Sequence, residues 1–152
     1  MKIKLIDKND LGNLYELNKL FGNDNSKENM KKHFEQNQNE IICIAYSDNI
    51  AVGYCAGLII KSICYNTCRL DIEALFVKEE YRQKGIGNSL IKFMEKEALL
   101  KNIFHLHLIT NQENAKAVKF YENLEYKKTG EILLDKNMDL NYENNIIEKL
   151  NV

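Results

Sequence analysis

Residues 82–89 read Arg82-Gln83-Lys84-Gly85-Ile86-Gly87-Asn88-Ser89, and they decide the fold. An apolar strand-like run, residues 69–77, precedes them, and a run with apolar residues at three- and four-residue steps follows. A strand that enters a helix through a glycine turn leaves backbone N–H groups unpaired at the helix start, where they favour an anion. The glycines allow close approach of the backbone to a ligand, and Arg82 offers a charged donor. The stretch therefore predicts a strand-turn-helix unit whose turn binds an anionic ligand.

Two familiar phosphate-binding turns do not match this stretch. The pattern G-x-x-x-x-G-K-[ST] is absent, and the dinucleotide pattern G-x-G-x-x-G fails because Leu90 stands three residues after Gly87. Taken alone, the two glycines favour a helix start that needs them only for packing.

Composition places the chain among ordinary globular domains. It has 152 residues, 45% of them apolar, and a formal net charge of −1, so we expect one domain over residues 1–152. The near-neutral charge argues against nucleic acid and membrane surfaces as partners. No apolar run approaches the roughly 18 to 20 residues of a membrane span, and the N-terminus does not resemble a signal peptide, so we expect a cytoplasmic protein.

Arginine is rare in this chain. Of 21 basic residues only Arg69 and Arg82 are arginine. Where almost every cation is lysine, an arginine suggests a position that needs a planar, multidentate donor.

The hydrophobic periods predict a mixed α/β (α+β) sheet that is mostly antiparallel and flanked by helices. We expect strands at residues 2–6, 41–46, 51–63, 69–77, 103–110, 126–134 and 146–150. Helices are expected after Asp10 and Ser26 as caps, after the glycine turn, and around residues 117–124. In the strand 69–77, strict alternation puts Leu70, Ile72, Ala74 and Phe76 on one face, and Asp71, Glu73, Leu75 and Val77 on the other.

The cysteines and histidines do not form a metal motif. Cys43 and Cys55 lie in apolar strands and are interpreted as buried thiols. Cys64 and Cys68 are spaced C-x3-C without a second Cys/His pair, so no metal site is expected. His105 and His107 share one strand face, where they either pack or approach a substrate.

Two segments together resemble one family. Residues 82–87 resemble the [Q/R]-x-x-G-x-[G/A] pyrophosphate-binding signature of the GNAT superfamily of N-acetyltransferases, and residues 114–122 resemble its N-x-x-A-x-x-F-Y-E segment. The resemblance implies that acetyl-CoA binds where two central parallel strands splay apart. The residues it assigns to the cofactor are Leu75, Phe76 and Val77 through their main chains, Arg82, Gln83, Lys84, Gly85, Ile86, Gly87 and Asn88 around the pyrophosphate, and Asn114. The resemblance also implies a homodimer.

The resemblance and the residues suggest a direct transfer. Tyr121 matches the family position near the thioester sulfur and is the candidate general acid; Glu73, two residues before Leu75, is the candidate general base. A strand N–H such as that of Leu75 would stabilise the developing oxyanion. Relatives usually have glycine where this chain has Glu125, so Glu125 must adopt the helix-ending conformation or the helix ends differently.

The acceptor is the least defined part of this interpretation. Acidic residues in the strand and in a later connection suggest a small cationic amine, such as a polyamine or an aminoglycoside; they are Asp71, Glu73, Asp135, Asp139 and Glu143. The alternatives are a protein N-terminus or lysine as acceptor, or a non-catalytic acyl-CoA-binding sensor.

Overall fold

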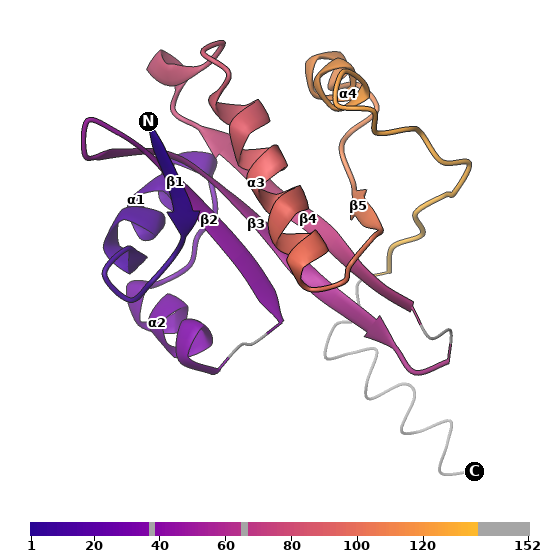
Figure 1. Ribbon diagram of the computed structural model, residues 1–152, viewed down its shortest axis with the longest axis horizontal. Helices are drawn as coiled ribbons and strands as arrows, with labels where there is room; N and C mark the ends of the chain where they lie inside the picture. The colour runs from indigo at the N-terminus through magenta and orange to yellow at the C-terminus, as the bar shows by residue number, and fades with distance from the viewer. Residues whose placement is uncertain (37–38, 65–66, 137–152) are drawn as a thin grey trace. The chain divides into compact units, whose positions relative to one another are not determined.

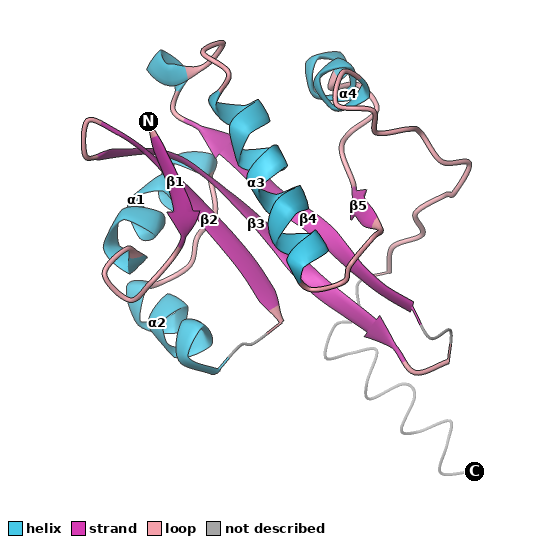
Figure 2. Ribbon diagram, viewed as in Figure 1, coloured by secondary structure: helices cyan, strands magenta, loops and turns pink. Residues whose placement is uncertain are grey.

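A computed structural model describes residues 1–36, 39–64 and 67–136 of the chain. They fall into two compact units, residues 1–118 and residues from 119 onward. The elements, seen in Figures 1 and 2, are β1 (Lys2–Leu5), α1 (Leu11–Phe21), α2 (Lys27–Gln36), β2 (Glu40–Ser47), β3 (Ile50–Ser62), β4 (Thr67–Val77), the short 3-10 helix η1 (Glu79–Tyr81), α3 (Ile86–Leu100), β5 (Leu106–Leu108) and α4 (Ala115–Glu122). That residues 1–152 act as one domain stays a prediction.

The first unit is built on one mixed sheet with the strand order β1-β2-β3-β4-β5. Neighbouring strands are antiparallel except for β4 and β5, which are parallel. The predicted mixed, mostly antiparallel fold is therefore confirmed. The hairpin between β2 and β3 turns through Asp48 and Asn49, whose φ angles of 49° and 65° fit a two-residue turn that matches the twist of the strands.

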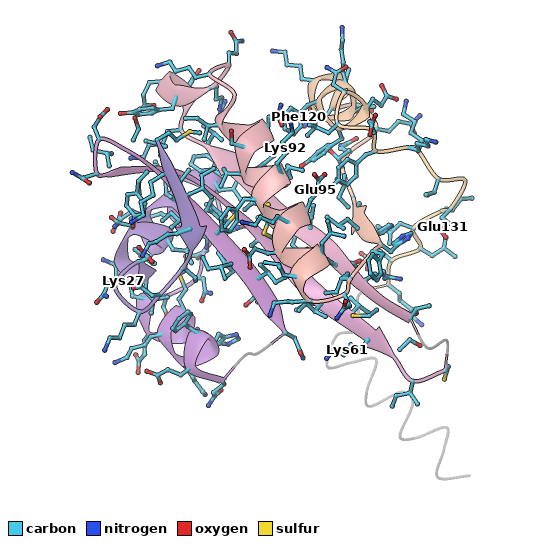
Figure 3. All side chains as sticks on the ribbon, viewed as in Figure 1. Lys27, Lys61, Lys92, Glu95, Phe120 and Glu131 are labelled. Carbon is cyan, nitrogen blue, oxygen red and sulfur yellow. The ribbon has the colours of Figure 1, made fainter. Side chains whose placement is uncertain are left out.

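Helices cover both faces of this sheet. On one face α1 contributes Leu14 and Leu17 to a cluster that includes Ile44, Tyr54 and Phe76. On the other face lies α3 (Figure 1), where the Cys43 thiol approaches the carbonyl of Leu90 at 3.9 Å. Figure 3 labels two polar side chains of α3, Lys92 and Glu95.

Both central cysteines are buried thiols, as predicted. Cys43 and Cys55 are fully buried and lie opposite each other in β2 and β3. Burial raises the pKa of Cys43 to about 12 and also raises that of Cys55, so neither thiol forms a thiolate readily at neutral pH.

A β-bulge in β4 corrects the predicted faces of that strand. Ala56 pairs with Ala74 and Gly57 pairs with Ile72, which leaves Glu73 as an extra residue. Leu70 precedes the bulge and lies on the α3 side, because a Cβ added at Gly57 would meet both Leu70 and Met94 at 3.0 Å.

After the bulge, the side chains of β4 lie on the opposite faces of the sheet from those predicted. Ala74 and Phe76 pack in the cluster with the α1 residues Leu14 and Leu17. The prediction that Leu70, Ile72, Ala74 and Phe76 share one face is therefore wrong, because one inserted residue shifts a period of two.

Two predicted helix caps have different outcomes. Ser26 caps α2, since its Oγ accepts the N–H of Asn29 at 3.1 Å. Asp10 precedes α1 as predicted, but its side chain makes no cap hydrogen bond. Its carboxylate accepts instead from the Asp7 N–H and the Tyr46 hydroxyl, both at 2.7 Å, and pairs with Lys4 at 2.7 Å. Asp10 is the one buried charged side chain within the described residues.

The second half of the chain has less strand than predicted. The expected strand 103–110 is formed only at Leu106–Leu108, and the described residues 126–136 contain no strand where 126–134 was expected. The strand predicted at 146–150 lies outside the described residues.

Candidate functional site

The predicted anion-binding turn begins α3. Gln83 and Gly85 have φ angles of 59° and 77°, and Gly85 is the N-cap residue. The first helical hydrogen bond runs from the Ser89 N–H to the Gly85 carbonyl at 3.0 Å. Within the residues that the structure describes, no backbone carbonyl accepts from the N–H groups of residues 83–88. These donors are therefore available to an anion at the positive end of the helix.

Two basic side chains in this turn fold back onto the preceding segment. The Arg82 Nε donates to the Val77 carbonyl at 2.9 Å, and the Lys84 Nζ donates to the Glu80 carbonyl at 2.9 Å. Arg82 thereby links the turn to the last residue of β4. Its position at the head of the turn is as predicted, while its contact with a phosphate stays a prediction.

Among the described residues, the edge of β4 that faces β5 is paired over only part of its length. The parallel pairs are Leu70 with Leu106, Asp71 with His107, and Ile72 with Leu108. Beyond Ile72 the register with β5 ends, and β4 continues to Val77. The expected separation of two parallel strands therefore coincides with the bulge at Glu73.

Main-chain groups along the rest of β4 alternate in direction. The Lys78 N–H donates to the Val52 carbonyl at 2.9 Å, so alternate residues of β4, including Phe76, turn their main chain toward β3. Leu75 and Val77 then direct theirs toward the open edge. That the main chains of Leu75, Phe76 and Val77 hold the cofactor stays a prediction. The direction of the Leu75 main chain and of the Val77 N–H suits a ligand that adds like a strand.

Glu73 lies where the bulge meets a cavity. The cavity has a volume of about 740 Å³ and lies between α1, α2 and the sheet. It is lined by Glu73 and Ala74 of β4, by Tyr54 and Ala56 of β3, and by residues of α1, α2 and the segment between them. Glu73 thus combines an exposed carboxylate with a position two residues from the Leu75 N–H.

A hydrogen-bonded group fixes one wall of the cavity. The Tyr54 hydroxyl and the Asn23 Nδ2 each donate to the Asn18 Oδ1 at 2.8 Å. Burial raises the pKa of Tyr54 to about 12, so its hydroxyl remains a donor at neutral pH. No motif in the sequence marked Asn18 or Asn23, because they reach the cavity only when α1 packs against β3.

Asp71 is engaged by Arg69. The Arg69 Nε and Nη2 donate to the two carboxylate oxygens of Asp71 at 2.7 and 3.1 Å, and the His107 Nδ1 lies 3.7 Å from Asp71 Oδ1. A bidentate clamp of this kind requires arginine. It gives Arg69 a structural role and leaves Asp71 less suited to hold a cationic substrate. Among the other acidic candidates, Asp139 and Glu143 lie outside the described residues.

Asn114 caps α4 in this structure. Its Oδ1 accepts the Ala117 N–H at 3.1 Å, which satisfies one donor of the first helical turn. Its predicted contact with the cofactor remains a prediction.

Tyr121 belongs to the second unit, within which its ring meets those of Phe120 and Tyr126 at centroid distances of 5.0 and 5.7 Å. The Tyr126 N–H donates to the Tyr121 carbonyl at 3.1 Å, and Glu125 has a φ of 68°. The helix therefore ends with Glu125 in the left-handed conformation that glycine usually supplies.

Two negative findings concern the described residues alone. Across residues 1–36, 39–64 and 67–136, no group of three or more His, Cys, Asp or Glu side chains is arranged to hold a metal ion. In the same part of the chain, no helix has the length and apolar character needed to cross a membrane.

Solved structures of similar fold include enzymes that act on different acceptors. An aminoglycoside N-acetyltransferase in complex with CoA matches with a TM-score of 0.77 and 20% identity, over 91% of this chain and 100% of that one. A ribosomal-protein-alanine N-acetyltransferase from Brucella melitensis matches with a TM-score of 0.75 and 16% identity, over 90% and 98%. At these identities the similarity shows the fold alone.

Sequence comparison identifies the family. An acetyltransferase of Sodalis glossinidius is 32% identical over 89 residues, which are 57% of this chain and 63% of that protein. The chain thus spans less than two thirds of the length of this curated relative. The Acetyltransferase (GNAT) family profile matches residues 11–126. Because this match covers well over half of the sequence, the chain belongs to the GNAT family of acetyltransferases.

Proposed function

We propose that the protein is an acetyl-CoA-dependent N-acetyltransferase that transfers the acetyl group directly to a primary amine of a small cationic acceptor. The observation that carries this proposal is that the free edge of β4 leads into the turn that begins α3. In the described part of the chain, the main chain of Leu75 and the N–H of Val77 face the unpaired edge of β4. The turn that follows has N–H groups without a backbone partner, and Glu73 lines a cavity.

Each part of this edge suits one part of acetyl-CoA. Leu75 and Val77 are suited to the amide-bearing arm, and the N–H groups of residues 83–88 are suited to the pyrophosphate. Bound acetyl-CoA would supply the acetyl group as an activated thioester. No metal is needed for this chemistry.

Glu73 is the proposed general base. An alkylammonium ion has a pKa of about 10.4, so the acceptor must lose a proton before its nitrogen can attack. Glu73 takes that proton directly or through water. The Leu75 N–H stabilises the negative charge that develops on the carbonyl oxygen as the C–N bond forms.

Tyr121 is the proposed general acid. A phenol is protonated at neutral pH and can give a proton to the departing thiolate as the C–S bond breaks. This role rests on the match of Tyr121 to the family segment and on its place in α4.

A thiol-release assay with acetyl-CoA and a panel of amines tests the proposal. Turnover is expected with small cationic amines, and Tyr121→Phe should lower kcat by about 10² to 10⁴. Phe120→Leu, which alters the neighbouring ring without removing a hydroxyl, is the control. Acetyl-CoA binding without turnover on any amine would favour a sensor, and turnover only on peptides would favour a protein acceptor. The homodimer and the cytoplasmic location stay predictions.

A further inference from the structure

The cavity beside Glu73 has two walls of different origin. Its floor is the sheet, where Ala56 and Ala74 lie next to the bulge. Its cover is α1, α2 and the segment that joins them, which carries Asp24. At the start of α2 the Lys27 Nζ, labelled in Figure 3, pairs with Glu16 of α1 at 3.3 Å. A ligand in the cavity would therefore lie between the sheet and the two helices.

Carboxylates stand on both of these walls. Glu73 lines the cavity from β4, and Asp24 lines it from the segment between α1 and α2. Glu40, at the start of β2, also lines it. The basic side chains among the lining residues are Lys101 and His33. The three carboxylates outnumber them, which favours a positively charged ligand.

About half of the lining surface of the cavity is hydrocarbon, and amide side chains such as that of Asn25 also line it. The apolar lining comes from aliphatic and aromatic side chains of both walls, such as Leu14, Phe21, Met30 and Ile42. Methylene groups gain free energy by lying against such a surface, as the stems of lysine side chains do. The hydroxyl groups of a sugar lose water against these apolar side chains, which offer them no hydrogen bond.

We infer that the acceptor is a linear alkyl diamine or polyamine, whose reacting nitrogen lies at Glu73 and whose second ammonium group lies at Asp24. The methylene chain between the two nitrogens spans the apolar lining. This inference rests on the proposed function and narrows it, since it separates linear polyamines from aminoglycosides. Asp24 acts here as a specificity residue that binds substrate and takes no part in proton transfer.

Matched pairs of amines test the inference. Diaminoalkanes of four to eight carbons are compared with the n-alkylamines of the same length, and a representative aminoglycoside is included. In the wild-type protein the kcat/KM of the preferred diamine should exceed that of its matched monoamine by about tenfold, because the second ammonium adds a charge-assisted contact.

Substitution of Asp24 should change the KM for diamines and leave the KM for monoamines unchanged. Because Asp24 is exposed, Asp24→Asn should raise the KM for diamines by about three- to fivefold, and Asp24→Lys by about tenfold, with kcat unchanged. The KM for the matched monoamines should not change. Glu28→Gln removes another exposed carboxylate, in α2, that does not line the cavity, and it should alter neither KM.

The outcomes separate this inference from the proposed function. Equal kcat/KM for diamines and monoamines, a preference for the aminoglycoside, or an equal effect of Asp24→Asn on both amine classes would overturn the inference while the acetyltransferase activity stands. Absence of turnover on every amine would overturn both together. Selective loss of diamine affinity in Asp24→Asn, with monoamine kinetics intact, would support it.

Discussion

Substitution of Gly85 tests the anion-binding turn most directly. Gly85 has a φ of 77°, and a Cβ added there meets no atom within 4 Å. The cost of a side chain is therefore backbone strain without a clash, about 1 to 2 kcal/mol for a residue forced into the left-handed region. For a chain of this size that loss lowers Tm by roughly 2 to 8 °C, so Gly85→Glu should still fold.

The effect on binding should be much larger than the effect on stability. A carboxylate at residue 85 would lie roughly 6 Å from two phosphate charges bound at the N–H groups of residues 83–88. With an effective dielectric constant of about 40, each pair of charges costs about 1.4 kcal/mol, and two cost about 2.8 kcal/mol. The Kd for acetyl-CoA should therefore rise by about 100-fold.

Two controls separate charge from strain. Gly85→Gln has the same shape and backbone cost without the charge. Gly22→Glu places the same residue at the C-cap of α1, where φ is 97° and a Cβ again meets nothing within 4 Å. Binding is measured by isothermal titration calorimetry with acetyl-CoA, and stability by thermal denaturation. Added salt should reduce the difference between Gly85→Glu and Gly85→Gln. Equal affinity of Gly85→Glu and Gly22→Glu for acetyl-CoA would refute the assignment of the turn.

Three further predictions follow from the site and the fold. Glu125→Gly should raise the free energy of unfolding by about 1 kcal/mol in chemical denaturation, because it relieves a non-glycine residue at φ 68°; no gain would mean that Glu125 is unstrained. Asp10→Asn should lower stability by about 2 kcal/mol at neutral pH. Burial raises the pKa of Asp10, but hydrogen bonds from Lys4, the Asp7 N–H and Tyr46 outweigh it and lower that pKa overall. This contribution to stability is present above the unfolded pKa of about 3.9 and is lost as the pH falls through the folded value, so the variant should differ least from the wild type in acid. Glu73→Gln should reduce kcat by about 100-fold in the thiol-release assay while the Kd for acetyl-CoA stays constant, and an unchanged kcat would remove Glu73 from its role as base.

Much of the fold could be predicted because local signals agreed with the final packing. The apolar steps from Leu11 to Phe21 fixed α1, and the change to alternation fixed the hairpin of β2 and β3. The glycine turn stood between a strand and a helix, and Gly85 did take the left-handed conformation that the turn requires. Ser26 capped α2 because its cap hydrogen bond depends on local chain geometry alone.

Features that depend on tertiary packing could not be predicted. The bulge at Glu73 leaves no mark in the composition of β4, because an inserted residue is defined only by the pairing of its neighbours with β3. Asp10 is of a residue type that often caps helices. Its carboxylate instead bonds to Lys4 of β1 and Tyr46 of β2, and not to the N–H groups of α1. Asp24 lies in a loop whose composition says nothing of the cavity it lines.

The contact between Arg82 and Val77 has a consequence for the behaviour of the chain at high concentration. An open strand edge is a template on which another polypeptide can pair and begin to aggregate. Here the open part of β4 is short, the bulge at Glu73 breaks its register, and the guanidinium of Arg82 already occupies the carbonyl of Val77. A small ligand needs only a few main-chain hydrogen-bonding groups of β4, whereas an added strand needs a long unbroken series of such groups. We therefore expect these features to disfavour the pairing of a second polypeptide along this part of β4.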